Sequence, residues 1–244
     1  MQKTSQIYGI RAVIEAINSN EPIDKVFIQK GLKGDLSREL EGLLRKKGIK
    51  ASYVPIEKLN HLTKNNHQGV VANISPITFH QLEELVETVV QKDKAPLFLL
   101  LDQLSDVRNF GAIIRTAECT GVDGIIIQKK GAAPVTADTI KTSAGAVFKI
   151  PIAKVDHIKD AVYYLQASGI SVVAATEKTD NYIYNIDFTG PAAIVMGSED
   201  RGISPSTLKA VDHLAKIPLL GEIGSLNVSV ACAVFLYEAV RQRQ

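Results

Sequence analysis

One stretch of the chain places polar residues directly after an apolar run. Residues 97–101 are apolar at every position and lead into a polar turn and a predicted helix that opens near Asn109. Ligands of open parallel sheets collect at the carboxyl ends of the strands, so polar residues here are candidates for binding or catalysis. Asn109 is one such candidate, and capping of the helix is the alternative role for its side chain.

Arg115 is the strongest chemical candidate in this predicted helix. It lies among Ile113, Ile114 and Ala117 on a helix that is expected to pack against the sheet, where an unpaired guanidinium is costly. We therefore expect Arg115 to have an anionic or hydrogen-bonding partner. A phosphate meets this requirement, and a carboxylate of the same chain is the alternative.

A second apolar run, residues 192–196, ends in a turn that is rich in glycine and charge. Gly197 lets the backbone approach a ligand closely, and Gly202 permits a turn with positive φ. Between them lie three consecutive charged residues, of which Glu199 is the first. An ordinary strand-to-helix turn has a similar composition. The turn is not a dinucleotide-binding fingerprint, because no strand is followed by G-x-G-x-x-G or by G-x-x-x-x-G-K-[ST].

A third glycine-containing loop leads into the last predicted helix. The chain passes from a strand that ends near Ile217 through this loop to a helix start at Ser225 and Asn227. Either side chain is suited to capping the helix. The free backbone amides of a helix N-terminus also suit a polar ligand group. Taken alone, this third pattern indicates no more than ordinary capping.

Length and composition are typical of a soluble globular protein. The chain has 244 residues, of which 45% are hydrophobic and 22% charged, so a disordered main state is excluded. The longest apolar runs have the length of strands, and we expect no membrane span. Cys119 and Cys232 do not form a disulfide framework; we interpret both as core residues of a protein in the reducing cytoplasm. The five scattered histidines offer no metal site. His61 and His67 flank a polar loop and are expected to be exposed, with contact to RNA as the alternative.

Charge divides the chain into a basic front and a slightly acidic remainder. Residues 1–75 hold 12 Lys and Arg against 7 Asp and Glu, whereas residues 76–244 hold 16 against 19. A basic front favours contact with a polyanion such as RNA, and an ordinary solvated lysine surface is the alternative. The pattern predicts a first domain at 1–75, a linker at 76–95 with an acidic amphipathic helix at 82–90, and a second domain at 96–244.

Hydrophobic periodicity predicts an α/β protein in both domains. The first domain has two helices, the second of them at 35–47, and strands at 26–28, 49–54 and 70–74. The second domain has helices between apolar strands at 97–101, 124–127, 170–174, 192–196 and 214–217. Such continuous apolar runs are typical of a parallel sheet that is covered on both faces. The last helix, at 226–241, is so apolar that we expect it to be covered, either within the chain or by another subunit.

Together, the three motifs resemble motifs one, two and three of the SpoU (TrmH-type) ribose 2′-O-methyltransferases, within the SPOUT class of trefoil-knot enzymes. The resemblance covers essentially residues 96–244, and the basic front resembles the L30e-like substrate-binding domain of that family. The layout is closest to the 23S ribosomal RNA guanosine 2′-O-methyltransferase and its tRNA relatives. The matching stretches are Asn109-x-Gly111-x-x-x-Arg115, Met196-Gly197-Ser198-Glu199 with Gly202 after it, and Ser225-Leu226-Asn227-Val228-Ser229.

The resemblance implies the fold and the methyl donor. The fold would be a SPOUT (α/β knot) parallel-sheet domain with a deep trefoil knot, a known exception to the rule that chains do not thread loops, plus a smaller L30e-like α/β domain. The donor would be S-adenosyl-L-methionine, bound in a pocket made by the knotted C-terminal segment. The residues expected to bind it are Gly197, Ile217, Leu226, Met196, Leu219, Ser225 and Asn227.

The resemblance also implies roles for the remaining motif residues. Arg115 would stay charged, because a guanidinium keeps its proton in proteins, and would bind a phosphate beside the reacting ribose and stabilise the developing alkoxide. Asn109 would orient the ribose hydroxyl or Arg115, and Glu199 would hold one of these two residues. The expected substrate contacts are Ser229, Lys141 and Ser143.

The expected function is methylation of the ribose 2′-hydroxyl of a guanosine in 23S ribosomal RNA. A tRNA substrate is the first alternative, and a non-catalytic RNA-binding assembly factor with the same fold is the second. In this class the active site forms at a homodimer interface, which would account for the apolar last helix. No metal and no membrane partner is expected.

Overall fold

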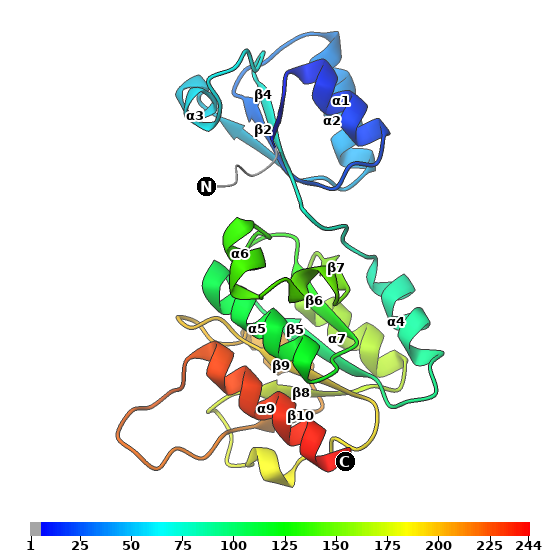
Figure 1. Cartoon of the computed structure of the whole chain (residues 1–244), viewed down its shortest axis with the longest axis vertical. Helices are drawn as coiled ribbons and strands as arrows, with labels where there is room; N and C mark the ends of the chain where they lie inside the picture. Colours follow the sequence, from blue (N-terminus) through cyan, green and yellow to red (C-terminus); the bar gives the residue numbers. More distant parts are fainter. Residues whose placement is uncertain (1–5) are drawn as a thin grey trace. The chain divides into compact units, whose positions relative to one another are not determined.

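The computed structural model describes residues 6–244, which form two compact units (Figure 1). The first unit comprises the described residues up to Thr78, with Val135–Ala137 grouped with them. The second unit begins at Phe79 and contains the rest of the chain. Among the described residues, no helix is long and apolar enough to cross a membrane.

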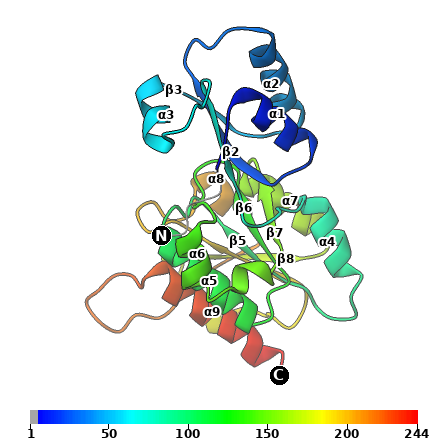
Figure 2. The same ribbon diagram turned by 45° about the horizontal axis from the view of Figure 1, so that its top comes forward.

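The first unit is a mixed four-stranded sheet with helices on both faces (Figure 2). Helices α1 (Ile10–Asn18) and α2 (Asp35–Lys46) pack on one face, and α3 (Ile56–Leu62) packs on the other. Strands β2 and β3 are parallel, and the other neighbours are antiparallel. The strand order is β1 (Gln6–Tyr8), β4 (Val70–Ile74), β2 (Ile23–Gln29) and β3 (Ala51–Val54). The sequence prediction missed β1 and α3, which are short.

The second unit is built on a six-stranded sheet in which all neighbouring strands are parallel. This confirms the predicted parallel sheet. Strands β5 and β9 have the predicted bounds, whereas β7 was not predicted, because this edge strand lacks a continuous apolar run. The strand order is β10 (His213–Ala215), β8 (Ser171–Ala175), β9 (Ala192–Met196), β5 (Leu97–Leu101), β6 (Gly124–Gln128) and β7 (Ile152–Val155).

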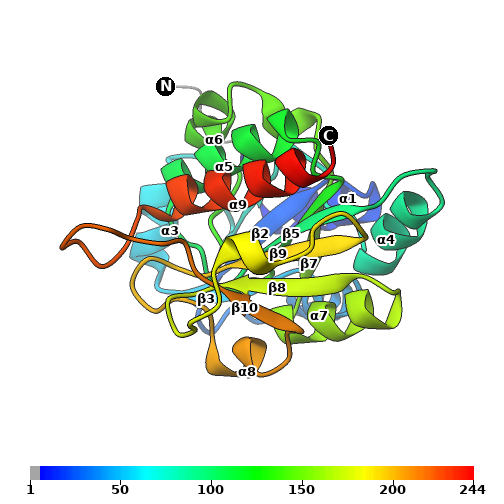
Figure 3. The ribbon, with the colours of Figure 1, turned by 90° about the horizontal axis from the view of Figure 1, so that it is seen from below.

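Helices cover both faces of this sheet (Figure 3). Helices α5 (Val107–Cys119) and α9 (Val228–Gln242) lie side by side on one face, and α4 (Leu82–Val90) and α7 (Ile158–Ala167) pack on the other. The shorter elements are α6 (Ala137–Thr142), η1 (Ala146–Phe148), η2 (Ile183–Asn185) and α8 (Pro205–Leu208). The trefoil knot implied by the resemblance stays a prediction.

The segment 76–95, predicted as a linker that carries an amphipathic helix, belongs from Phe79 onward to the second unit. Its helix α4 has the predicted bounds, and its apolar face is part of the core of the second unit. Gly124 at the start of β6 lies directly against this helix, since a Cβ at position 124 would come within 2.8 Å of Leu85 Cδ2. The second unit therefore includes α4. Periodicity located the apolar face of this helix, but only the sheet beneath it shows where that face is buried.

Two truncated chains test the inclusion of α4. A chain that begins at residue 79 is expected to fold, whereas one that begins at residue 96 exposes the sheet surface that four buried apolar side chains of α4 cover. Each such side chain contributes about 1.5–3 kcal/mol when it is fully buried. Urea unfolding monitored by circular dichroism should therefore give a much lower midpoint, or aggregation, for the 96–244 chain. Equal midpoints for the two chains would contradict the assignment.

Candidate functional site

The three motifs meet at the carboxyl ends of neighbouring strands in the second unit. Strand β5 leads into α5, and its neighbour β9 leads into the turn 197–203. Strand β10 is followed by the loop 216–227, which extends from the body of the unit as an orange segment before α9 (Figure 3). Parallel strands end at the same edge of a sheet, which is why residues more than 100 positions apart come together here.

Side chains of all three motifs form one hydrogen-bonded cluster. Glu199 Oε1 accepts a hydrogen bond from Asn109 Nδ2 and a second, of 3.0 Å, from Asn227 Nδ2. Asn227 Nδ2 also lies 3.2 Å from Asn109 Oδ1. On its other side, Asn227 Oδ1 accepts hydrogen bonds from the backbone amide and the hydroxyl of Ser229. The cluster ties the N-termini of α5 and α9 to the turn after β9.

Different residue types cap the two helices of this cluster. Helix α5 begins at Val107, and Asp106 caps it by accepting a 2.7 Å hydrogen bond from the backbone amide of Asn109. The capping role considered for the Asn109 side chain is therefore wrong, and this side chain is left to bond to Glu199 and Asn227. For α9 the capping prediction is confirmed, because Asn227 accepts the amide of Ser229 at 2.9 Å.

Arg115 is exposed, which contradicts the prediction that it is buried against the sheet. Its neighbours Ile113 and Ile114 are fully buried, but successive helical residues point in directions about 100° apart. Among residues 6–244, Arg115 forms no hydrogen bond or ion pair, so the carboxylate alternative is wrong as well. Glu199 was expected to hold either Asn109 or Arg115, and it bonds to Asn109. The Arg115 guanidinium is therefore available to an anion from outside the subunit.

The turn after β9 depends on two glycines. Ser198 and Gly202 exchange backbone hydrogen bonds of 3.1 and 2.9 Å, and Gly202 has the predicted positive φ, +65°. A Cβ on Gly197 would lie 2.2 Å from the carbonyl carbon of Gly202. Gly197 is thus needed for the approach of the opposite arm of the turn, and the ligand approach expected at this residue stays a prediction.

A buried carboxylate that the sequence interpretation did not single out supports this turn. Asp102 follows β5 and is fully buried, and its Oδ2 accepts a 2.9 Å hydrogen bond from the amide of Ser204. Its own amide donates to the carbonyl oxygen of Met196 at 2.8 Å. Within the described part of the chain, Asp102 Oδ1 has no hydrogen-bond partner. An aspartate directly after a fully apolar strand was the signal in the sequence that could have identified this residue. A buried carboxylate is costly, so it needs hydrogen-bond donors.

A cavity of about 670 Å³ opens at the cluster. Its volume lies within the usual range for small-molecule sites, about 300–1,000 Å³. Glu199 and Asn227 belong both to the cluster and to the cavity wall. The structure brings all seven residues that were expected to bind the methyl donor to this wall: Met196, Gly197, Ile217, Leu219, Ser225, Leu226 and Asn227.

The three predicted substrate contacts differ in their exposure. Lys141 is exposed on α6, and Ser229 is half-buried beside the cluster. Ser143 is fully buried, and its hydroxyl donates to the carbonyl oxygen of Ile140 at 3.2 Å, so the predicted substrate contact through this hydroxyl is contradicted. Burial of this segment follows from close packing of α6 on α5, where a Cβ at Gly111 would lie 1.8 Å from Thr142 Oγ1.

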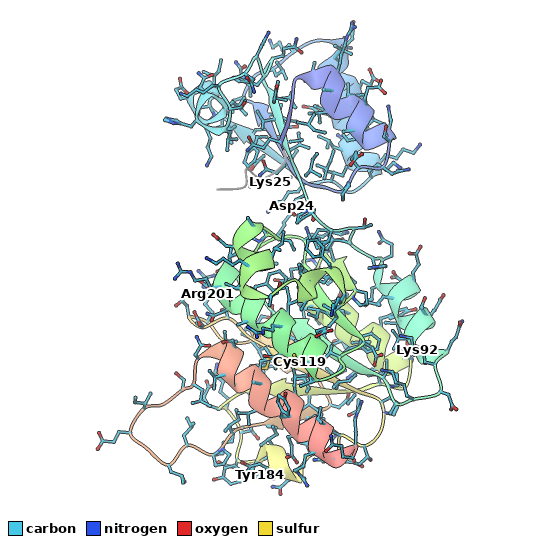
Figure 4. All side chains as sticks on the ribbon, viewed as in Figure 1. Asp24, Lys25, Lys92, Cys119, Tyr184 and Arg201 are labelled. Atoms are coloured by element: carbon cyan, nitrogen blue, oxygen red, sulfur yellow. The ribbon has the colours of Figure 1, made fainter. Side chains whose placement is uncertain are left out.

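The cysteines and the acidic groups add no second reactive centre to the site. Cys232 is buried as predicted, and burial raises the pKa of its thiol to about 12, which keeps it neutral at physiological pH. Cys119 lies exposed at the end of α5 (Figure 4), so its predicted place in the core is wrong. No group of three or more His, Cys, Asp or Glu side chains in residues 6–244 is arranged to hold a metal ion.

A covered parallel sheet with a cavity at its strand ends is typical of α/β domains that bind a small ligand. Residues 96–237 match the model of the SpoU rRNA Methylase family, and residues 6–80 match the model described as RNA 2′-O ribose methyltransferase substrate binding. The chain belongs to the SpoU rRNA methylase family. It is an RNA methyltransferase, and S-adenosylmethionine is its methyl donor.

Relatives that carry the same two regions are similar along their whole length. The TrmH family tRNA/rRNA methyltransferase YacO of Bacillus subtilis is 35% identical over 243 residues, which cover 99% of this chain and 97% of the relative. A TrmH family tRNA/rRNA methyltransferase of Staphylococcus aureus is 36% identical over 238 residues, 97% of this chain and 96% of that protein.

Solved structures support the same assignment. The SpoU methyltransferase AviRb of Streptomyces viridochromogenes, in complex with AdoMet, is 27% identical with a TM-score of 0.61, over 98% of this chain and 90% of that one. An AdoMet-bound rRNA methyltransferase of Sinorhizobium meliloti is 26% identical with a TM-score of 0.62, over 97% and 86%. The A. aeolicus TrmH/SpoU tRNA modifying enzyme is 31% identical with a TM-score of 0.57, over 66% of this chain and 82% of that one.

The cavity suits this methyl donor in its chemistry. Met196, Leu219 and Leu226 offer apolar surface to a flat base, and the backbone groups at the strand ends offer hydrogen bonds to its polar edge. When bound, S-adenosylmethionine supplies a methyl group on a positively charged sulfur.

Substitution of Asp102 tests whether the buried carboxylate supports the Glu199 turn. Asp102→Ala leaves the amide of Ser204 without its acceptor, which should lower the free energy of unfolding by about 1–3 kcal/mol. Asp102→Asn keeps a carbonyl acceptor and removes the charge, and is expected to recover most of the loss. Urea unfolding measures both, with the exposed Lys130→Ala as a control. If Asp102→Ala is as stable as the control variant, the supporting role is wrong.

Proposed function

We propose that this chain methylates the ribose 2′-hydroxyl of a guanosine in 23S ribosomal RNA. The observation that carries the proposal is the hydrogen-bonded cluster of Asn109, Glu199 and Asn227, from three separate motifs, of which Glu199 and Asn227 also line the cavity. The match of residues 6–80 to an RNA substrate-binding model supports RNA as the partner. The solved rRNA methyltransferase of S. meliloti supports ribosomal RNA as its class.

In the proposed mechanism, the residues of the chain position the hydroxyl and stabilise its oxygen as the proton leaves. A ribose hydroxyl is a poor nucleophile, so negative charge on its oxygen must be stabilised as the new bond forms. Glu199 holds the Asn109 amide, which orients the hydroxyl. Arg115 stays charged, binds the phosphate beside the reacting ribose, and stabilises the developing alkoxide. Ser229 and Lys141 contact the RNA.

Arg115 is tested by substitution with separate measurements of chemistry and donor binding. Arg115→Ala should lower kcat by about 100- to 1,000-fold, the usual cost of removing one group that stabilises an oxyanion. Donor affinity, measured by calorimetry, should be unchanged because Arg115 does not line the cavity. Arg115→Lys keeps the positive charge but loses the bidentate hydrogen bonding of the guanidinium, so it should recover activity only in part. Loss of donor binding in Arg115→Ala would refute this role.

A homodimer is part of the proposal. The outer face of α9 carries Val230 and Tyr237, which are 49% and 55% exposed, with half-buried Val234 between them at helical spacing. Val228, Cys232 and other residues of the inner face are buried within the chain, which confirms that interpretation for the inner face. For the outer face, cover by another subunit stays a prediction. A second copy on the outer face would bring its own residues next to the exposed Arg115 on the neighbouring α5.

Charge placed on this outer face is expected to separate the subunits. Val230→Glu combined with Tyr237→Asp puts two carboxylates into the proposed apolar interface and should convert the dimer into a monomer at micromolar concentration. Light scattering coupled to size-exclusion chromatography measures the mass. The matched control is Tyr163→Asp, which changes a similarly exposed tyrosine on α7. A monomeric unsubstituted protein would refute the interface.

Mass-spectrometric mapping of lost ribose methyl groups in a deletion strain tests the substrate. Loss of one methyl group from a 23S guanosine is the expected result. Loss from tRNA would favour the second candidate, a tRNA 2′-O-methyltransferase, which the similarity to the A. aeolicus tRNA modifying enzyme supports. A protein that fails to bind S-adenosylmethionine would instead be a non-catalytic assembly factor. A cytoplasmic location belongs to the same proposal.

A further inference from the structure

A second cavity, of about 530 Å³, lies in the first unit where α3 ends. It is formed by the end of α3 and the loop that leads into β4. All of its lining residues have polar side chains: Asn60, Thr63, Lys64, Asn65, Asn66 and His67. We call this cavity the asparagine pocket.

A buried histidine orients the first asparagine of the pocket. His67 is only 8% exposed, which contradicts the expected solvent exposure. Its Nδ1 accepts a 3.0 Å hydrogen bond from the amide of Gly69, so the ring proton lies on Nε2. Nε2 then donates to Asn60 Oδ1 at 2.9 Å. This bond engages the carbonyl oxygen of Asn60 and leaves its NH₂ group to a ligand.

The rest of the pocket adds donors, acceptors and positive charge. Asn65 and Asn66 are exposed, and each amide offers both a carbonyl oxygen and an NH₂ group. Lys64 adds a cation, and residues 58–68 contain no acidic residue. Gln68 and Gly69 both have positive φ, +49° and +79°, which turns the chain back into β4 and sets the shape of the loop.

Three further lysines of the first unit lie near one another. Burial lowers the pKa of Lys25, and the positive charges of Lys50 and Lys58 lower it further, with Asp24 acting in the opposite direction. Figure 4 labels Lys25 in this unit. Lys58 lies on α3, the helix whose end forms the pocket.

We propose that the asparagine pocket binds one unpaired base of single-stranded RNA, and that Lys64 contacts an adjoining phosphate. This inference rests on the proposed function and adds a place where the base sequence is read. Side-chain amides pair with base edges, because both present donors and acceptors side by side. Lysines bind the backbone without regard to sequence.

Two features favour a base in the pocket over other ligands. The C-terminal end of a helix carries partial negative charge, so the end of α3 disfavours a phosphate in the pocket itself. The cores of protein interfaces are enriched in Tyr, Trp, Phe and Met, and no residue that lines this pocket is of these types. Unpaired RNA bases are therefore better matched to the pocket than a protein segment.

Fluorescence anisotropy with labelled poly(A), poly(C) and poly(U) tests the proposal on the full chain. The unsubstituted protein should bind one of these RNAs preferentially. Asn65→Ala combined with Asn66→Ala should reduce that preference about tenfold, since a good amide–base pair contributes about 1–3 kcal/mol of discrimination. Lys64→Gln should instead weaken all three complexes alike and lower their salt dependence. Asn18→Ala, an exposed asparagine of α1, is the matched control and should change nothing.

Three results would overturn the proposal. The first is an unsubstituted protein without preference, and the second is an Asn65/Asn66 variant that keeps it. The third is an Asn65/Asn66 variant that binds RNA normally but no longer sediments with ribosomal particles. In that case the occupant of the pocket would be a protein. Thermal unfolding confirms that each variant is folded.

Methyl transfer to ribosomal RNA and tRNA is measured in parallel. If the unsubstituted protein transfers methyl groups but the pocket test fails, only the pocket proposal is refuted. If the unsubstituted protein transfers no methyl group, the proposed methyltransferase function is refuted instead.

Discussion

The hydrogen bonds of one carboxylate join the three segments that make up the site. Glu199 Oε1 accepts from Asn109, 90 residues earlier, and from Asn227, 28 residues later. Nothing in local structure brings these side chains together. The sheet does so, because β5 and β9 are adjacent and parallel and end at the same edge. Beneath them, the buried Asp102 bonds to the segment that closes the Glu199 turn.

The inner faces of the paired helices α5 and α9 stabilise the fold, and their outer faces carry the groups proposed to act on ligands and partners. Their inner faces pack on the sheet, and Cys232 and Phe110 are almost fully buried there. The outer faces carry an exposed arginine and an exposed apolar stripe. A guanidinium held at the surface without an internal partner can bind a phosphate without first breaking an ion pair, which suits Arg115 to the role proposed for it.

Strand pattern predicted a large part of the fold, and the resemblance of the three motifs to a known family implied the residues of the cavity wall. Strands such as 97–101 are apolar at every position because they are buried on both faces, and this leaves a clear signal in the sequence. The environments of single side chains were less predictable. Arg115 and Cys119 were assigned from their neighbours in sequence, and Ser143 from the family resemblance, whereas helix rotation and the packing of α6 on α5 determine their exposure.

The sequence by itself determined the alternation of strands and helices, the basic first domain and the family to which the second domain belongs. These properties depend on residue type and spacing along the chain, which folding does not change. Only the tertiary structure decided that α4 belongs to the second unit, that His67 is buried and orients Asn60, and that Glu199 bonds to Asn109 in preference to Arg115. Each of these contacts joins groups whose relative directions are set by packing.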